Sequence, residues 1–138
     1  MADNKRLLDI LNESISRELG ALTTYMWQHV MAKGLESPEP SEIIKKTAMA
    51  EMKHAEKFAE RLDYLGGVPT TKPSPIKVGG DIRAMLKHDV GLEEDAIALY
   101  KKAIKLCVEL NDPVSRLLYE EILTDEESHH YAFTTLLG

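Results

Sequence analysis

The feature that most constrains this chain is a pattern of glutamates and histidines that occurs twice. The first two glutamates are separated by 33 residues (51 − 18), and the last two by the same interval (126 − 93). The second glutamate of each pair is followed three positions later by a histidine. The six residues are Glu18, Glu51 and His54 in one half and Glu93, Glu126 and His129 in the other. Each half therefore supplies one lone glutamate and one Glu-x-x-His, as expected of two related helical hairpins.

Four segments have apolar residues at every third or fourth position, the pattern of amphipathic helices. We expect these helices at about residues 3–34, 40–65, 81–110 and 113–136. Residues 66–80 contain three prolines and four glycines, which exclude a helix there. This segment is long for a turn, so we expect it to cross the length of the bundle and to place the second and third helices parallel. The predicted fold is all-α, a four-helix bundle with a long crossover between helices two and three.

Helix phase places the repeated residues on the apolar stripes rather than on the charged faces. Glu18 lies between Ile15 and Leu22 on the stripe of the first helix. Residues three positions apart share one face of a helix, so Glu51 and His54 both lie on the apolar side of the second. The other three occupy the equivalent stripes of the third and fourth helices. All six are therefore expected to converge in the interior of the bundle.

A competing register exists in the second half, because Glu94, Glu127 and His130 have the same spacing. The helical neighbours of these three residues are charged or polar, which indicates a solvated face. The helical neighbours of Glu93 and Glu126, one residue earlier in each helix, are apolar. We therefore expect the interior residues of this half to be Glu93, Glu126 and His129.

Four carboxylates and two imidazoles in a bundle core are costly unless they are paired or coordinated. Two divalent cations would bring four positive charges against the four carboxylates. Mixed carboxylate and imidazole ligands suit iron or manganese, and they also bind zinc. A single helical glutamate is usually a surface residue, so the prediction rests on the repeated spacing on apolar faces. The pattern predicts a dinuclear metal site, in which two glutamates can bridge both ions.

Composition limits the other functions that the chain could have. Its 138 residues suffice for one domain with a sizeable core, over residues 1–138. No apolar run approaches the roughly 20 residues of a membrane span, and residues 1–6 lack the apolar core of a secretory signal. The single cysteine, Cys107, cannot form an internal disulfide, which favours a reducing cytoplasm. The formal charge of −6 argues against sequence-independent nucleic-acid binding. We expect a cytoplasmic protein with neither a nucleic-acid nor a membrane partner.

The chain resembles the bacterioferritins of the ferritin-like di-iron superfamily, along nearly all of its length. The most specific matching segments are Arg17-Glu18-Leu19, Glu51-Met52-Lys53-His54-Ala55-Glu56, Asp89-Val90-Gly91-Leu92-Glu93 and Ile122-Leu123-Thr124-Asp125-Glu126-Glu127. The resemblance implies a ferritin-like bundle whose ferroxidase centre holds two iron ions. It also implies that the six residues above are the ligands, with Glu51 and Glu126 bridging.

The implied activity is oxidation of Fe(II) to Fe(III) by O2 or H2O2, with storage of the ferric product and detoxification of iron. Tyr25 matches a tyrosine beside the family's ferroxidase centre, although by its own position it is equally a core tyrosine. Asp89 and Asp125 lie near the predicted ligands, and either could orient a histidine through its second ring nitrogen. Each is equally well placed to be an exposed acid.

The resemblance also bears on haem and on assembly. In the family, the methionine of Glu-Met-Lys-His binds haem b axially, one from each subunit across a two-fold axis; here it is Met52, though methionine also commonly fills interfaces. Lys46 and Ala50 stand where some bacterioferritins carry a histidine and an aspartate of an inner-surface iron site. The family's fourth helix continues beyond the position of Gly138 and is followed by a short fifth helix that helps close the cage. We expect a homo-oligomer, at least a dimer, and leave open whether it is a cage.

Two other classes of function fit part of the pattern. One is a peroxide-reducing di-metal protein of rubrerythrin or manganese-catalase type. A rubrerythrin proper carries a Cys-x-x-Cys module, which a single cysteine excludes. The other is a haem-bridged dimer that serves electron transfer. Retention of ferric mineral, fast peroxide turnover and a haem absorption band distinguish the three.

Overall fold

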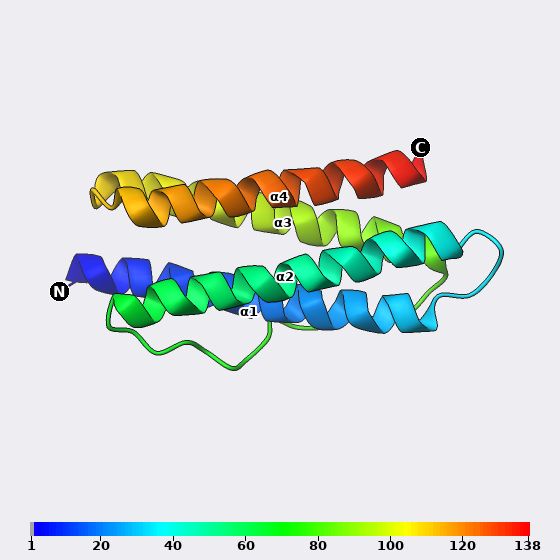
Figure 1. The fold of residues 1–138 in the computed structure, drawn as a ribbon, viewed down its shortest axis with the longest axis horizontal. Coiled ribbons are helices and arrows are strands. Elements are labelled where there is room, and N and C mark those ends of the chain that lie inside the picture. The colour runs from blue at the N-terminus through cyan, green and yellow to red at the C-terminus, as the bar shows by residue number, and fades with distance from the viewer. Residues whose placement is uncertain (1) are drawn as a thin grey trace.

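The structure is a computed structural model that describes residues 2–138, with side chains from residue 4 onward. Within those residues there are four helices and no strand: α1 (Ala2–Met31), α2 (Pro38–Tyr64), α3 (Ile82–Glu109) and α4 (Pro113–Leu137). The hairpins α1–α2 and α3–α4 pack side by side, mainly through α1 against α3 and α2 against α4 (Figure 1). The all-α four-helix bundle predicted from the sequence is confirmed.

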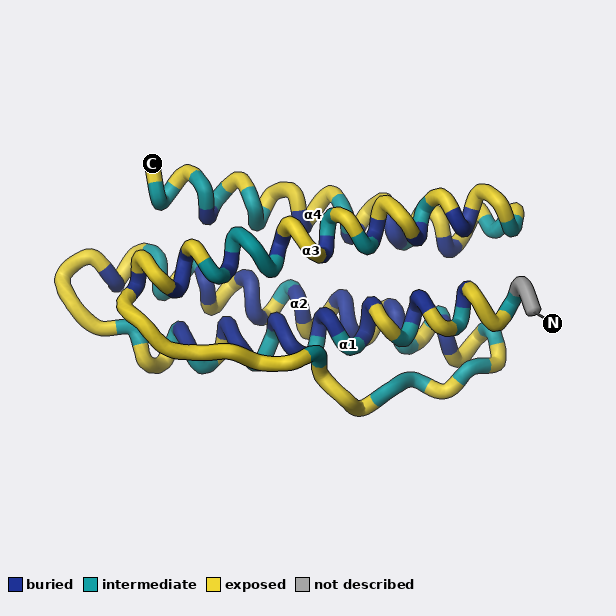
Figure 2. Tube along the Cα trace, turned by 180° about the vertical axis from the view of Figure 1, so that it is seen from behind, coloured by how far each residue is buried: buried dark blue, intermediate teal, exposed yellow. Residues whose placement is uncertain are grey.

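The connection between α2 and α3 runs along the outside of α1, so that α2 and α3 point in the same direction (Figures 1 and 2). Backbone hydrogen bonding fixes its path, because the Ser74 N–H donates to the Ser16 carbonyl at 2.8 Å. The Asn12 side chain holds the same connection at two points, donating to the Val68 carbonyl at 3.1 Å and accepting from the Thr70 N–H at 2.8 Å. The predicted long crossover is thus present, and α1 anchors it.

Gly20 of α1 allows the crossover to approach this closely. A Cβ atom at Gly20 would lie 3.1 Å from the Ser74 carbonyl oxygen and 3.3 Å from the Ser74 Cβ, closer than most side chains tolerate. The absence of a side chain therefore brings the crossover onto the part of α1 that carries Arg17 and Glu18.

The starts of the second pair of helices follow from local side-chain chemistry. Asp81 caps α3 by accepting from the Ala84 N–H at 2.9 Å, and Asp112 caps α4 by accepting from the Ser115 N–H at 3.0 Å. Pro113 is the first residue of α4, where its missing N–H costs nothing. The fourth helix therefore starts at residue 113, as predicted.

The core has two apolar clusters, one toward each end of the bundle. The first surrounds Phe58, Tyr100 and Tyr119, and the second surrounds Tyr25 and Phe133. The predicted glutamates and histidines lie between the two clusters. None of the helices in the described part of the chain is long and apolar enough to cross a bilayer.

Candidate metal centre

The structure brings all six residues of the repeated pattern together in the middle of the bundle. Each helix contributes in the predicted way, with a lone glutamate from α1 and α3 and a Glu-x-x-His from α2 and α4. All four glutamates are completely buried, His54 is almost so, and the His129 side chain is 15% exposed. The repeat in the sequence thus becomes a near-symmetric arrangement of ligand atoms in space.

The six residues form two groups that could each hold one metal ion. One group contains Glu18, Glu51, His54 and Glu126, and the other contains Glu51, Glu93, Glu126 and His129; within each, the ligand atoms lie within 4.8 Å of one another. Glu51 and Glu126 belong to both groups. Two carboxylates shared in this way have the placement that is needed to bridge a pair of ions.

Buried atoms without hydrogen-bond partners show that the site fits a cation. Among the described residues, four such atoms belong to the first of the two groups: Glu18 Oε2, Glu51 Oε1, His54 Nδ1 and Glu126 Oε1. Only ion-pair contacts join them, such as that of 3.1 Å between His54 Nδ1 and Glu51 Oε1. Carboxylate oxygens and an imidazole nitrogen are also the ligands that iron accepts. The arrangement therefore fits two divalent ions of the iron class.

Arg17 is the residue of this site that the sequence did not reveal. Its guanidinium donates to Glu51 and Glu126, to Glu93 at 2.6 Å and, more weakly, to Glu18 at 3.3 Å. One cation thus contacts all four carboxylates. The matching segment Arg17-Glu18-Leu19 contained it, but helix phase does not decide whether a long side chain at the border of a stripe turns inward.

Tyr100 is a second neighbour of the carboxylates that was not predicted. It is completely buried, and its hydroxyl donates a hydrogen bond to Glu18. Tyr100 lies seven residues after Glu93, on the buried face of α3. That spacing of two helical turns was the available signal that its hydroxyl reaches the site.

Burial and charge perturb the acids and bases of the centre in opposite directions. Burial alone would raise the pKa of Glu51, but the Arg17 guanidinium and hydrogen bonds with His54 and Glu126 together outweigh it and hold that pKa well below its usual range. Burial raises the pKa of Glu126, and the charges of Glu18 and Glu51 raise it further. Burial alone would lower the pKa of His54, but its contacts with Glu18 and Glu51 raise it to about 10. Without metal, the cluster is thus a network of ion pairs that retains protons.

Of the two aspartates proposed to orient a histidine, only Asp125 contacts one. His54 Nε2 lies 2.8 Å from Asp125 Oδ2, which directs Nδ1 toward the carboxylates. Asp89 instead accepts a hydrogen bond from the Gln28 side chain at 2.7 Å and is completely buried, so it neither orients a histidine nor lies exposed. Burial is the main cause that raises the pKa of Asp89, to about 8.

Tyr25 and Met52, which the sequence linked to the site by resemblance, occupy different environments. Tyr25 is completely buried and packs edge-on against Phe133, with ring centroids 5.7 Å apart. Its pKa is raised by burial and then by the nearby charge of Glu93. Met52 is half exposed on the outer face of α2, beside the equally exposed Met49.

The competing register lies on the surface, as its polar neighbours indicated. His130 Nε2 pairs with Glu94 Oε2 at 3.2 Å, and the Glu94 side chain is 62% exposed. Glu127 is exposed as well. These residues supply matched controls for the buried set.

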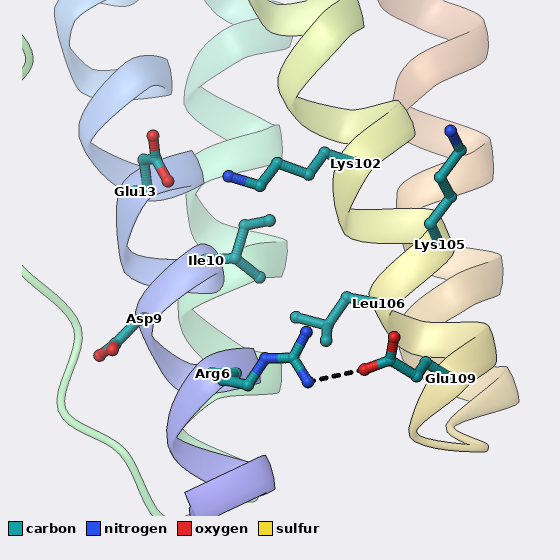
Figure 3. Close-up of a pocket in the computed structure, with 8 residues that line it drawn as sticks. All are labelled: Arg6, Asp9, Ile10, Glu13, Lys102, Lys105, Leu106 and Glu109. Carbon is teal, nitrogen blue, oxygen red and sulfur yellow. Dashed lines mark hydrogen bonds and ion pairs between the residues drawn. The ribbon is translucent and has the colours of Figure 1, made fainter.

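A surface groove between α1 and α3 is separate from the carboxylates. It encloses about 410 Å³, and an ion pair of 2.6 Å between Arg6 and Glu109 spans it (Figure 3). Both partners of this pair are more than half exposed. Its floor is apolar, from Ile10 and Leu106. Exposed, balanced charge of this kind offers no concentrated ligand set, so the interior cluster remains the candidate site.

Comparison with known proteins agrees with this geometry. The ferritin-like domain family matches residues 8–138, so the fold and the site define a ferritin-like protein. The bacterioferritin of Desulfovibrio desulfuricans is 34% identical over 125 residues, which cover 90% of this chain and 70% of that protein. The bacterioferritin of Rhodobacter capsulatus is 33% identical over 133 residues, which cover 94% of this chain and 81% of that protein. The chain belongs to the bacterioferritin family.

Solved structures show the same likeness. A ferritin-like, diiron-carboxylate protein from Bacillus anthracis has a TM-score of 0.96 at 28% identity, covering 100% of this chain and 99% of its own. The D. desulfuricans bacterioferritin, described with its diiron site in different catalytic states, has a TM-score of 0.92 at 31% identity, covering 99% and 80%. The R. capsulatus bacterioferritin, described with a metal-free dinuclear site and haem iron, has a TM-score of 0.91 at 29% identity, covering 96% and 84%.

Proposed function

We propose that the protein is a ferroxidase, which oxidises Fe(II) to Fe(III) at the interior cluster in the service of iron storage and detoxification. The observation that carries the proposal is the sharing of Glu51 and Glu126 between two ligand groups. Shared carboxylates hold two ions close together, and a pair of Fe(II) ions can pass two electrons to one acceptor. Balanced for O2, two Fe(II) and two protons give two Fe(III) and H2O2; with H2O2 as the oxidant, the reduced product is water.

The residues around the cluster supply binding and proton transfer. Metal binding requires the ligand atoms to release their protons, and His54 Nδ1 is the atom that must do so on α2. Asp125 keeps a proton on His54 Nε2 and so fixes the orientation of the imidazole ring. Nδ1 can then exchange its proton for a metal ion. The Asp125 side chain is 56% exposed, so it connects this histidine to solvent. Glu126, whose pKa is raised, is a second group that gives up a proton when metal arrives.

The test is Fe(II) oxidation by the metal-stripped full chain. Anaerobic addition of Fe(II) followed by O2 or H2O2 is expected to give a fast phase of two Fe(III) per chain, followed by iron that remains with the protein on gel filtration. Glu51→Ala should lack the fast phase, and His130→Ala should retain it. Rapid decomposition of peroxide without retained iron would indicate the rubrerythrin-like or manganese-catalase-like alternative. Absence of both reactions would contradict a redox site.

Haem binding is a second candidate property, and the exposure of Met52 favours it. A half-exposed thioether beside a second exposed methionine on α2 is available to a partner subunit and to a haem iron. We propose a homo-oligomer, at least a dimer, in which this face is shared. Reconstitution with haem should give a Soret band that Met52→Leu removes, whereas Met49→Leu should retain it. A wild-type protein without the band would contradict haem binding.

A further inference from the structure

Arg17 occupies the position at which metal ions would have to sit. Its Nη1 atom contacts Glu51 and Glu126, the two residues shared by both ligand groups, and Nη2 contacts Glu93. A guanidinium and a metal ion need the same carboxylates and carry charge of the same sign. The two cannot occupy the cluster together without strong repulsion.

The guanidinium nevertheless leaves one of its hydrogen-bond donors without a partner. Its Nε atom is buried without a hydrogen-bond partner in the described part of the chain, and the residue is only 9% exposed. Nη2 makes one further contact, to the Leu92 carbonyl at 3.2 Å. Arg17 is therefore held by the charge of the carboxylates rather than by a complete set of hydrogen bonds. Neutralisation of that charge by metal removes the main interaction that keeps it inside.

The outer side of α1 offers room for a second position of the side chain. Arg17 lines a cavity of about 310 Å³ between α1, α3 and the crossover, and Glu13 and Asp95 line the same cavity. Glu13 lies one helical turn before Arg17, the spacing at which a glutamate and an arginine pair on a helix. Gly20 and Ser74 line the cavity as well. An outward rotation would thus take the guanidinium from four buried carboxylates to two exposed ones.

Glu13 also connects this cavity to the surface groove between α1 and α3, because it lines both. Figure 3 shows Glu13 on α1 with the Lys102 side chain extending toward it from α3. An outward Arg17 would share Glu13 with this lysine. Glu13 and Asp95 are both exposed, and Asp95 does not line the groove of this lysine.

We infer that Arg17 is an exchangeable internal cation: it balances the carboxylates in the metal-free protein and moves to the cavity of Glu13 and Asp95 when metal binds. The inference rests on the proposed metal centre and adds a positioning residue to it. Arg17 stabilises the empty site and competes with metal for it. By thermodynamic linkage, whatever it contributes to the stability of the metal-free protein is subtracted from metal affinity.

The test compares metal-stripped wild type with Arg17→Gln and Arg17→Lys, using Co2+ as the probe and visible absorption and melting temperature as the readouts. Arg17→Gln should lower the melting temperature of the metal-free protein, leave that of the Co2+-loaded protein nearly unchanged and tighten Co2+ binding by about tenfold or more. Arg17→Lys keeps the charge but loses the planar fork, so it should fold and give a smaller shift in the same direction.

Arg61→Gln is the matched control, because Arg61 is also largely buried and pairs with Asp112 at 3.0 Å, at the α4 N-terminus. It should lower both melting temperatures equally and leave Co2+ affinity unchanged. The double variant Glu13→Gln/Asp95→Asn removes the outer position, and it should weaken Co2+ binding without lowering the melting temperature of the metal-free protein.

Weaker or unchanged Co2+ binding in both Arg17 variants would overturn the exchange. Unchanged binding in the double variant would overturn the outer position. A wild-type protein that binds no Co2+ at all would instead overturn the proposed metal centre, so the two failures are distinguishable.

Discussion

The two sides of the carboxylate cluster treat their buried polar groups in opposite ways. On the side of Phe58, the Tyr119 hydroxyl pairs with Ser14 at 2.8 Å, and Ser14 donates to the Ile10 carbonyl at 2.8 Å. On the side of Phe133, three buried polar atoms have no partner among the described residues: Tyr25 Oη, Gln28 Oε1 and Asp89 Oδ2. The first side thus satisfies these polar groups within the protein, whereas the second leaves three polar atoms without a partner among the described residues.

This difference separates a part of the core that serves stability from a part that is suited to chemistry. The rings of Phe58, Tyr100 and Tyr119 pack in tilted contact, with centroids within 5.6 Å of one another. Both hydroxyls have partners, that of Tyr119 in Ser14 and that of Tyr100 in Glu18. Tyr25 and Asp89 instead present unpartnered oxygens beside the carboxylates. We therefore expect substitutions on the first side to change stability and those on the second side to change proton uptake and reactivity.

The largest effect is expected at the boundary between the two sides. Glu51→Ala removes a ligand shared by both groups, so metal should be lost from the purified protein. Loss of a residue that merely orients a ligand costs about 10–100-fold in affinity, and a shared ligand should cost more. Metal analysis after dialysis against Fe(II) or Zn2+ measures it. His130→Ala changes the exposed set of Glu94, Glu127 and His130, and this variant should keep its metal. Equal metal retention by both variants would contradict the assignment of the metal site to the buried set.

A smaller effect is expected at Asp89, and it should depend on pH. The pKa of Asp89 is raised to about 8 from an ordinary value of 3.8, so the folded chain keeps a proton that the unfolded chain releases. The contribution of the protonated Asp89 carboxyl to the free energy of unfolding is fully present below pH 3.8 and is lost as the pH rises toward 8. The free energy of unfolding of Asp89→Asn should therefore rise relative to that of the wild type as the pH increases. Between pH 5 and pH 8 this difference should grow by about 2–4 kcal/mol. Urea unfolding of metal-free protein at both values measures the difference, and a constant difference would show that Asp89 is ionised throughout.

The smallest effects are expected from a matched pair of tyrosines. Tyr119→Phe breaks the bond to Ser14 and should cost about 1 kcal/mol of unfolding free energy. Tyr25→Phe removes a hydroxyl without a partner and should change stability by less than about 0.5 kcal/mol. Tyr25→Phe should slow Fe(II) oxidation, because that hydroxyl lies near Glu93, while Tyr119→Phe should not. Equal stability losses in urea unfolding would mean that the two sides do not differ.

The fold and the convergence of the six residues could be predicted because both depend on periodicity along single helices. Glu18 and Glu51 stand on apolar stripes, and this position alone directs them inward. Arg17 could not be placed in the same way. Its inward turn depends on carboxylates that are 34, 76 and 109 residues away in the chain. Nor does periodicity show that Asp89 would meet Gln28, since that pairing depends on how α1 lies against α3.

The central claim is that the cluster holds two metal ions between shared carboxylates. The most direct measurement is an anaerobic titration of the metal-stripped chain with Co2+, followed by visible absorption. The account predicts saturation at two ions per chain, and loss of that binding in Glu51→Ala. Saturation at one ion, or binding that Glu51→Ala leaves intact, would contradict it.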